Sequence, residues 1–600
     1  MKLSHWLVAS SIVLALVACG ESTPPLTESV KADLSASNAT EKPSATSELA
    51  LLSDNFMKRA YEDNAYLKLM SGEPITSLPN NTLVHAQEGA VQASTWLAQL
   101  RQIDRNALEH QDQLSAAMLE HKLQLAIEAP KHYWPFFDVT PYQAGFVFSS
   151  LLTPALKGAT LANAEDVAGY LELISDVGRY VGDQLERLKG QQERGILLPK
   201  AAIGGVKAAY TGLQHGLPAL TAVDDSRLAA LSGNDRQLLT TGIEKALSED
   251  VLPRVDALLV YLDEDYSAGA PESVGTGQYP GGKEAYRYAV SRETTLDLTP
   301  ENIHQRGLDY VATLQAEMKA IRDELGFEGT QQEFHTQMRK DVRFYAKTPE
   351  EVEQRYMAYI EKIEPLISDY FSRLPKAPYG VKRLDLASEA GMTFGYYSVP
   401  TAASDKGLYF YNGSQLDNRP MVWTAALIFH ELIPGHHFHL ALQNENTELS
   451  DFRRKTSDYT AFTEGWANYA ASLAGEMGLL DDPMEHYGWL LFDSFISVRL
   501  VLDTGMNYFA WPLEKARAYM LENTFSSEAE VATETLRYST DLPAQALAYK
   551  LGFEKIKALR AAAQARLGKN FDIKEFHAAA VGSGAMPLHI LEKHVNRTLK

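Results

Sequence analysis

The chain has 600 residues, of which 45% are hydrophobic and 22% are charged, and its formal net charge is −21. A chain of this length and composition can bury a large core, either as one big domain or as several smaller ones. The strong negative charge argues against nucleic acid as a partner. The single cysteine, Cys19, excludes an intramolecular disulfide and any cysteine-based metal site.

The N-terminus has the pattern of a secretory signal. A basic residue, Lys2, precedes an apolar run that ends in the sequence LVAC and is too short to span a membrane. This ending resembles the lipobox of bacterial lipoproteins, which implies a signal peptide of residues 1–18, cleavage before Cys19 and a lipid on Cys19. An ordinary cleaved signal, in which Cys19 has no role, is the alternative.

The residues after the signal indicate a location and a division of the chain. Gly20 and Glu21 follow the cysteine, which by resemblance to Gram-negative lipoproteins favours the outer membrane, facing the periplasm. Residues 19–47 are rich in Ser, Thr, Pro, Ala and Glu and contain no aromatic residue, as expected for a disordered tether. We therefore divide the remainder into a helical N-terminal region, 48–270, and a C-terminal region, 271–600.

Helices dominate the expected secondary structure. In the N-terminal region apolar side chains recur at spacings of three and four, for example over residues 165–188 and 238–262, without a cluster of catalytic spacing. We interpret this region as a helical scaffold. Further along the chain, Thr299 and Pro300 predict the start of another helix, because a hydroxyl cap and a first-turn proline are typical of that position.

Residues 393–419 are the clearest strand-forming stretch. They contain Tyr396, Tyr397 and Val399 and then the run LYFYN. This stretch lies immediately before a histidine-rich segment. It is expected to form either an edge strand that pairs with an extended peptide or a hairpin that packs on the core.

The histidine-rich segment is MVWTAALIFHELIPGHHFHL, which begins at Met421. Its apolar helix-like run carries His430 and Glu431 into the interior, where an unpartnered charge is costly. A divalent metal is the natural partner, because zinc takes neutral imidazoles and a carboxylate. A spare glutamate beside the metal can serve as a general base.

The spacing differs from the usual H-E-x-x-H arrangement, in which both histidines lie on one helical face. The fourth residue after His430 is Pro434, and His436 and His437 would lie about 9 and 10.5 Å further along an ideal helix. Two imidazoles so far apart cannot easily share an ion. Pro434 lacks the N–H that would bond the carbonyl of His430, so the helix is expected to break there. The break can bring His436 back toward His430.

The segments HELIPGHH, TEGWANYA and LPAQALAYKLG resemble the bacterial family called "domain of unknown function 885", over roughly residue 275 to the C-terminus. The resemblance implies a relative of the gluzincin zinc peptidases: a mainly α, zincin-like fold with a small β-sheet beside the active-site helix. Within its H-E-x-x-P-G-H pattern the matching positions are His430, Glu431 and His436. His437 remains an open substitute for His436.

A catalytic zinc usually has three protein ligands and an open position. Residues 459–477 are expected to form a helix with a buried apolar face, and Glu464 lies in it. By resemblance to the family's E-G-W-A pattern, Glu464 is the third ligand of one zinc ion. The alternative is that Glu464 lies on a solvated helix face.

By the same resemblance, Glu431 would take a proton from the water that attacks a peptide carbonyl. The developing oxyanion needs a donor, and Tyr549 is the first candidate because peptidases of related shape use a distal Tyr or His. Tyr538 and His577 are reserves. For each of the three, a structural role is the alternative.

Other residues suggest competing interpretations. Arg499 and Asp503, flanked by apolar residues, are expected to form an internal ion pair, although Arg499 could instead meet a substrate carboxylate. The stretch LVLDTG from Leu500 also matches the aspartic-peptidase signature, but that chemistry needs two such aspartates and the chain has one copy. The absence of a G-x-S-x-G motif from the sequence argues against a serine hydrolase.

The sequence therefore predicts a lipid-tethered zinc metallopeptidase that hydrolyses peptide bonds in the bacterial envelope. The alternative is a non-catalytic lipoprotein that binds peptides or envelope components, with a structural or vestigial metal site. Cleavage preference, exo- or endopeptidase action and oligomeric state are left open.

Overall fold

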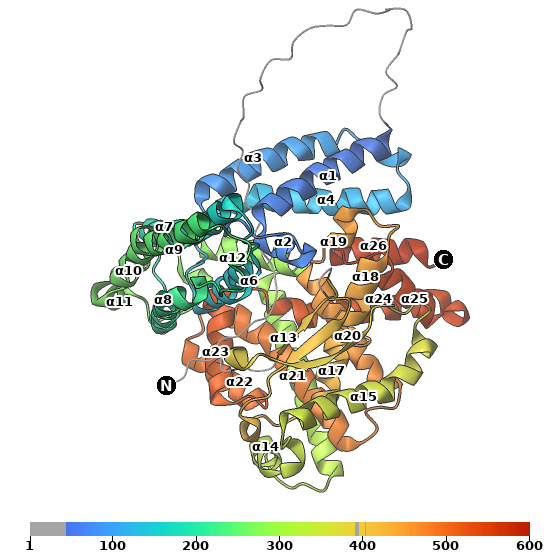
Figure 1. Cartoon of the computed structure of the whole chain (residues 1–600). Coiled ribbons are helices and arrows are strands. Elements are labelled where there is room, and N and C mark those ends of the chain that lie inside the picture. Colours follow the sequence, from blue (N-terminus) through green and yellow to red (C-terminus); the bar gives the residue numbers. More distant parts are fainter. Residues whose placement is uncertain (1–43, 390–394, 402–403) are drawn as a thin grey trace, which may run out of the picture.

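The computed structural model describes residues 44–389, 395–401 and 404–600 (Figure 1). The expected signal peptide, Cys19 and most of the tether lie outside these ranges. The side chain of Ser44 accepts a hydrogen bond from Ser47 N and caps helix α1 (Ala45–Asp63), which therefore starts slightly before the expected folded boundary. None of the helices in the described ranges combines the length and apolar character needed to cross a lipid bilayer.

The N-terminal part is helical, as expected. Its helices are α1 (Ala45–Asp63), α2 (Ala65–Ser71), α3 (Leu83–Leu100), α4 (His110–Glu128), α5 (Pro141–Gly145), α6 (Thr153–Gly158), α7 (Ala164–Gln192), α8 (Lys200–Thr221), α9 (Gly233–Lys245), α10 (Leu252–Tyr261) and α11 (Glu264–Gly269). The helix expected over 165–188 is α7. The stretch 238–262 is divided between α9 and α10 by a π-helical turn at Ala246–Val251.

Two hydrophobic clusters organise this part. One is built from residues between Ala65 and Tyr279 and holds α7, α8 and α10 together. The other joins α1, α3 and α4 to the C-terminal helices, for example through the edge-on contact of Phe56 with Phe452. In Figure 1, α1, α3 and α4 accordingly form a layer across the top of the molecule. The division between residues 270 and 271 stays a prediction.

The C-terminal part carries further helices and the sheet. Its helices are α12 (Gly282–Thr294), α13 (Pro300–Glu324), α14 (Gln331–Lys340), α15 (Pro349–Tyr370), α16 (Leu386–Glu389), α17 (Thr424–Glu431), α18 (His436–Glu445), α19 (Asp451–Lys455), α20 (Thr460–Glu476), α21 (Pro483–Asn507), α22 (Leu513–Asn523), α23 (Glu528–Leu536), α24 (Leu547–Leu567), α25 (Ile573–Val581) and α26 (Leu588–Thr598). The predicted start of α13 is confirmed, because the Thr299 side chain accepts from Asn302 N. The fold is mainly α with one small sheet, as predicted.

The sheet consists of β1 (Tyr379–Arg383), β2 (Gly395–Ser398) and β3 (Gly407–Tyr411) in the order β1-β3-β2. The central strand β3 pairs parallel with β1 and antiparallel with β2, and Tyr397 lies opposite Tyr409. The stretch 393–419 thus contains two of the three strands. Tyr409 is buried in the core, whereas β2 is a half-buried edge strand.

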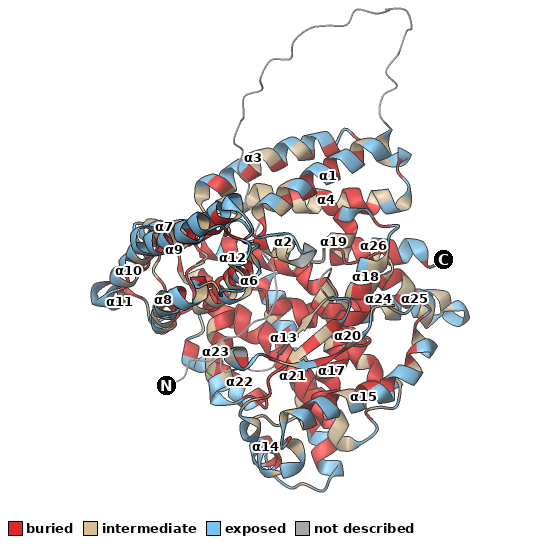
Figure 2. Cartoon of the chain, viewed as in Figure 1, coloured by how far each residue is buried: buried red, intermediate tan, exposed pale blue. Residues whose placement is uncertain are grey.

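The helices around the sheet are buried deeply. Figure 2 shows α17, α20 and α21 as largely red ribbons in the middle of the C-terminal part. Helices α20 and α24 approach closely at two glycines, because a Cβ on Gly465 would lie 2.5 Å from the backbone of Gly552. Side chains at these positions would push apart the two helices that carry Glu464 and Tyr549.

Candidate metal centre

The helix breaks at Pro434, as the sequence predicted. Helix α17 ends at Glu431 and α18 begins at His436. The turn between them folds tightly onto α17, since a Cβ on Gly435 would lie 1.9 Å from the carbonyl oxygen of His430. The indole Nε1 of Trp466 donates to the carbonyl of Pro434 at 3.1 Å and fixes the turn from α20. The ring centroids of His430 and His436 are consequently 4.6 Å apart.

Three side chains from α17, α18 and α20 converge beneath this break. Glu464 Oε2 lies 3.3 Å from His430 Nε2 and 3.3 Å from His436 Nε2. All three side chains are buried, and their potential ligand atoms lie within 4.8 Å of one another. Although both imidazoles are close, Glu464 Oε2 makes no well-directed hydrogen bond among the described residues. The group could hold a metal ion.

The charges in this group depend on one another. Burial opposes ionisation of Glu464, but His436 and His430 outweigh it and hold the pKa of this carboxyl well below its usual range. Burial also opposes protonation of His436, but the carboxylates of Glu464 and Glu431 raise the pKa of this imidazole. The pKa of His430 is lowered, chiefly by burial. The site therefore offers a carboxylate with two nitrogen ligands.

Asn468 orients His430. Its Oδ1 lies 3.0 Å from His430 Nδ1, so in the neutral imidazole this nitrogen carries the proton and the lone pair of Nε2 is available to a metal. Asn468 Nδ2 in turn donates to the carbonyl of Tyr549 at 3.4 Å. Asn468 is not among the site residues predicted from the sequence. Its place one helical turn after Glu464 on the same face of α20 was the available signal.

His437 lies outside the group. Its Nε2 donates to the carbonyl of Ala377 at 3.1 Å, and its Nδ1 accepts from the Tyr397 hydroxyl at 2.9 Å. Both nitrogens are therefore used to attach α18 to the sheet region. The structure brings His436, and not its neighbour, beside His430 and Glu464.

Glu431 follows His430 directly and is half-buried. Within the described ranges its carboxylate takes part in no hydrogen bond or ion pair. Burial raises its pKa to about 7, partly offset by His436 and reinforced by Glu464. An unengaged carboxyl group with this pKa is suited to accept and release a proton near neutral pH.

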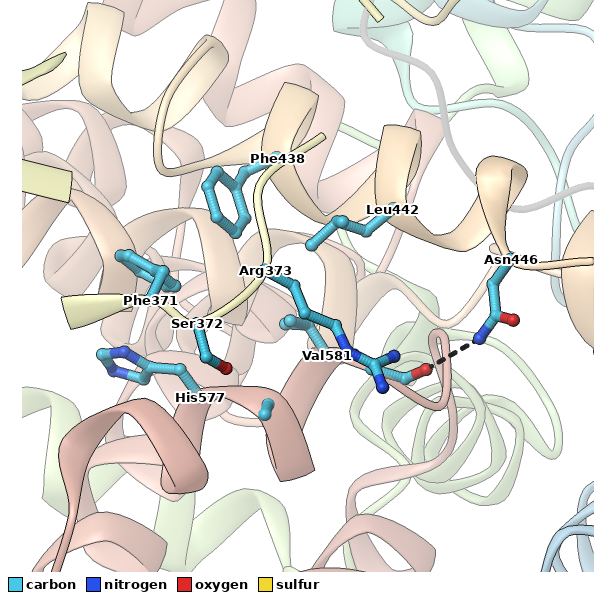
Figure 3. A pocket seen from close by; sticks show the side chains of 10 residues that line it. Phe371, Ser372, Arg373, Phe438, Leu442, Asn446, His577 and Val581 are labelled. Carbon is cyan, nitrogen blue, oxygen red and sulfur yellow. Dashed lines mark hydrogen bonds between the residues drawn. The ribbon is translucent and has the colours of Figure 1, made fainter. Parts of the chain in front are cut away.

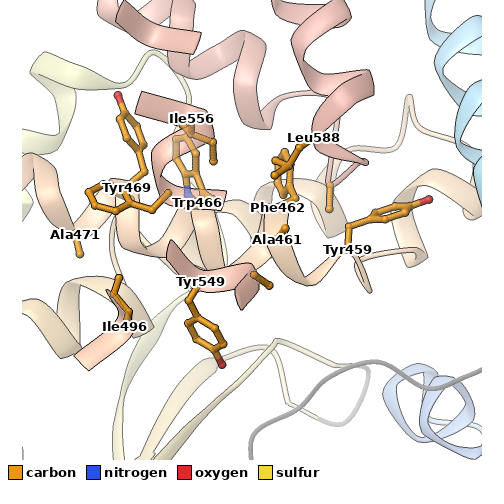
Figure 4. Close-up of a cluster of buried hydrophobic side chains, with 14 of the residues drawn as sticks. Tyr459, Ala461, Phe462, Trp466, Tyr469, Ala471, Ile496, Tyr549, Ile556 and Leu588 are labelled. Carbon is orange, nitrogen blue, oxygen red and sulfur yellow. The ribbon is translucent and has the colours of Figure 1, made fainter. Parts of the chain in front are cut away.

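Tyr549 lies on α24 close to the same group. Figure 4 shows its ring turned away from Trp466 and Ile556, which belong to the hydrophobic packing of α20 on α24. The guanidinium of Arg499 lies 4.5 Å from the centre of the Tyr549 ring. Burial, and next the charge of Glu464, raises the pKa of Tyr549, so the phenol keeps its proton and remains a donor.

Tyr538 and His577, the reserve candidates, are engaged elsewhere. The Tyr538 hydroxyl donates to Glu534. His577 Nδ1 donates to the carbonyl of Tyr370, and its Nε2 accepts from the Tyr469 hydroxyl, both at 2.8 Å. His577 also lines a small pocket between the end of α15, α18 and α25 (Figure 3), and none of the three clustered residues lines it.

The expected ion pair between Arg499 and Asp503 is wrong. Arg499 Nη2 lies 3.4 Å from Glu534 Oε2, whereas Asp503 accepts from the Tyr286 hydroxyl at 2.6 Å and from Ala544 N at 3.1 Å. Arg499 and Asp503 lie one turn apart on the same face of α21. Near Arg499 this face packs against α23, which carries Glu534, whereas near Asp503 it packs against α12 and the segment before α24. Asp503 is a buried structural acceptor in a helix, which also removes the aspartic-peptidase interpretation.

The fold and the site together define a class: a mainly helical protein with a buried two-histidine, one-glutamate group and an unengaged glutamate next to the first histidine. The chain belongs to the family described as "Bacterial protein of unknown function (DUF885)", whose profile matches residues 71–595. The match starts well before residue 275, so it includes most of the N-terminal helices.

Two solved bacterial structures have folds similar to that of this chain. A candidate lipoprotein from Colwellia psychrerythraea aligns with a TM-score of 0.81 and 26% identity, covering 93% of this chain and 99% of that chain. A candidate lipoprotein of unknown function from Shewanella oneidensis aligns with a TM-score of 0.66 and 18% identity, covering 91% and 99%. A candidate oligoendopeptidase F from Bacillus anthracis reaches only 0.24, at 13% identity over 84% and 95%, which is too low to indicate a common fold. The comparison with curated proteins gave no match.

Proposed function

We propose that the protein is a zinc-dependent metallopeptidase that hydrolyses peptide bonds in the bacterial envelope. The observation that carries this proposal is the convergence of His430 Nε2, His436 Nε2 and Glu464 Oε2, with the unengaged carboxylate of Glu431 beside them. Two imidazoles and a glutamate form a ligand set of catalytic zinc sites, which keep a further position open.

The chemistry of the donor set fits a zinc ion, and so do the two separations that involve Glu464. Ligand atoms of a tetrahedral zinc, at metal–ligand distances of about 2.0–2.1 Å, are separated by about 3.3–3.4 Å. Glu464 Oε2 lies 3.3 Å from each of the two Nε2 atoms. Zinc, when bound there, would supply a Lewis acid that polarises the peptide carbonyl and makes water acidic enough to attack near neutral pH.

The protein's own groups would then move the proton. Glu431 accepts a proton from the attacking water and delivers it to the leaving amine as the C–N bond breaks. Its raised pKa, about 7, matches this two-way transfer. Tyr549 donates its phenolic proton in a hydrogen bond to the developing oxyanion. Two observations support this role: Tyr549 is close enough to Glu464 to feel its charge, and Asn468 donates a hydrogen bond to the backbone carbonyl of Tyr549.

The edge strand β2 supports a peptide as substrate. An edge strand leaves backbone N–H and C=O groups available to an extended chain. Tyr397 of β2 bonds His437, and its ring centroid lies 6.4 Å from that of His436, so the strand borders the metal centre. A peptide paired with β2 would pass close to Glu431.

We also propose that a lipid on Cys19 anchors the protein to the envelope, at the outer membrane facing the periplasm. The lipobox-like sequence carries this part of the proposal. The names of the similar Colwellia and Shewanella proteins, both candidate lipoproteins, agree with it.

The test is the metal content and peptide hydrolysis of the soluble form that begins at Ser44. We expect stoichiometric zinc in the wild type, its loss in Glu464→Ala and His436→Ala, and its retention in the matched control His437→Ala. Glu431→Gln should keep zinc and lose hydrolysis. If the wild type takes up no zinc, the peptidase proposal fails. If it holds zinc but cleaves no member of a diverse peptide library, the non-catalytic binding protein is favoured.

A further inference from the structure

We propose that His439 is a positioning residue that holds His436 in its ligand orientation through a bridging water molecule. This inference rests on the proposed zinc site and adds a residue that the family motif and the sequence analysis did not assign. The two histidines of the metal centre have different surroundings.

The two histidines differ in what holds their second nitrogen. The Nδ1 of His430 has Asn468 as its acceptor at 3.0 Å. The Nδ1 of His436 is buried and has no hydrogen-bond partner in the described part of the chain. Because His436 turns Nε2 toward Glu464, its neutral ligand form carries the proton on Nδ1. A buried N–H without an acceptor is costly, so this nitrogen requires a partner.

His439 is placed to supply that partner. It follows His436 by three residues on α18, which puts both side chains on one helical face. It is only 1% exposed, and neither of its ring nitrogens has a partner among the described residues. The ring of Phe462 covers it at a centroid distance of 5.8 Å. Three unsatisfied nitrogens from two neighbouring imidazoles thus occur together in a buried region.

The rings of His436 and His439 are too far apart for a direct hydrogen bond. The ring centroids of His436 and His439 are 6.2 Å apart, with an interplanar angle of 52°. One water with hydrogen bonds of about 2.8–3.0 Å on each side spans this gap between ring nitrogens. The water accepts from His436 Nδ1–H and donates to one nitrogen of His439. Buried waters of this kind typically satisfy two or more polar groups at once.

This arrangement would act on the metal centre in two ways. It fixes the tautomer and the ring orientation of His436, and it increases the electron density on the Nε2 that faces Glu464. His439 itself is not a ligand, because the group of side chains close enough to share an ion consists of His430, His436 and Glu464.

The test compares zinc affinity, measured by competition with a chelator, for the soluble wild type, His439→Leu and His439→Gln. Leu removes every hydrogen bond, and Gln retains an acceptor and a donor. We expect His439→Leu to weaken zinc binding by about 10–100-fold, as for other partners of ligating histidines, and Gln to restore most of it. The visible spectrum of the cobalt(II) form should change in the Leu variant and return toward wild type in the Gln variant.

A purely structural role predicts a different pattern. His335 of α14 is the matched control, because it is also buried but bonds the Tyr487 hydroxyl at 3.0 Å in another part of the core. His335→Leu should lower thermal stability without changing zinc affinity. His439→Leu should lower zinc affinity as well as thermal stability, because it leaves the buried Nδ1–H of His436 without its partner. Unchanged zinc affinity in His439→Leu overturns the inference and leaves the zinc site standing, whereas a wild type without zinc overturns both.

Discussion

His430 and His436 lie on two different helices, and their ring centroids are only 4.6 Å apart. The short turn that separates α17 from α18 makes this possible, and at Gly435 it leaves no room for a Cβ, which would lie 1.9 Å from the carbonyl oxygen of His430. The imidazole geometry of the metal centre therefore depends on a backbone path that requires glycine at position 435.

Gly435→Ala should damage this path directly. The added Cβ would lie 1.9 Å from the carbonyl oxygen of His430, so the turn must open. We expect a loss of stability of about 1–3 kcal/mol, in the range of overpacked sites, and weaker zinc binding. Denaturant unfolding and chelator competition measure the two effects. Gly475→Ala on α20 is the control, because its Cβ would meet nothing closer than 3.7 Å. Equal behaviour of the two variants would contradict the role assigned to the turn.

Asn468→Leu should weaken metal binding without removing a ligand. The substitution leaves His430 Nδ1 without its acceptor, and the expected loss in zinc affinity is about 10–100-fold. Asn468→Asp keeps an acceptor at the same place and should bind zinc more tightly than the Leu variant. A Leu variant with wild-type affinity would show that His430 needs no such support.

Tyr549→Phe should separate catalysis from metal binding. The loss of one oxyanion donor lowers kcat by about 10²–10³-fold. Zinc content should not change, because Tyr549 is not among the clustered residues. Steady-state kinetics on a peptide that the wild type cleaves measures the kcat of both proteins. Tyr538→Phe is the comparison, since its hydroxyl serves Glu534, and a larger kcat loss in that variant would reassign the donor.

Glu534 should be important for stability although it lies outside the metal centre. It is fully buried and pairs with Arg499 and Arg537 at 3.4 and 3.2 Å. Glu534→Gln leaves two buried guanidiniums without their carboxylate, which should cost about 3–5 kcal/mol. The exposed carboxylate of Glu476, paired with Arg560, is the matched control, and Glu476→Gln should change the free energy of unfolding by about 0–1 kcal/mol. Similar small losses in both variants would refute the prediction.

Asp503 should make stability depend on pH. Burial raises its pKa to about 7 in the folded protein, against 3.8 ordinarily, despite hydrogen bonds from Tyr286 and Ala544 N. The unfolded chain therefore releases this proton near pH 4, and the folded chain releases it only near pH 7. Between these pH values the folded state binds more protons, so the contribution of Asp503 to the free energy of unfolding is present at low pH and is lost as the pH rises from about 4 to about 7. Urea unfolding at pH 5 and pH 8 should show a smaller decrease for Asp503→Asn than for the wild type. Identical decreases would mean that Asp503 is ionised throughout.

Local sequence features determined much of the fold. The helical periodicity of α7, the Thr299 cap and first-turn Pro300 of α13, and the aromatic strand-forming run of β3 are short-range signals, and each corresponds to an observed element. The break between His430 and His436 was also predictable, because Pro434 removes a backbone donor wherever it occurs in a helix. The residues that form the candidate metal centre could therefore be named from the sequence and the family pattern.

Tertiary structure decided which neighbours these residues meet. The sequence left His436 and His437 as alternatives, and only the approach of the Ala377 carbonyl and the Tyr397 hydroxyl assigns His437 to the sheet region. The partners of Arg499 and Asp503 likewise come from segments that are distant along the chain. The contact of Asn468 with His430 and the role proposed for His439 likewise depend on tertiary packing. Periodicity and motif spacing describe a segment by itself, whereas hydrogen-bond partners depend on how α17, α18, α20 and the sheet pack together.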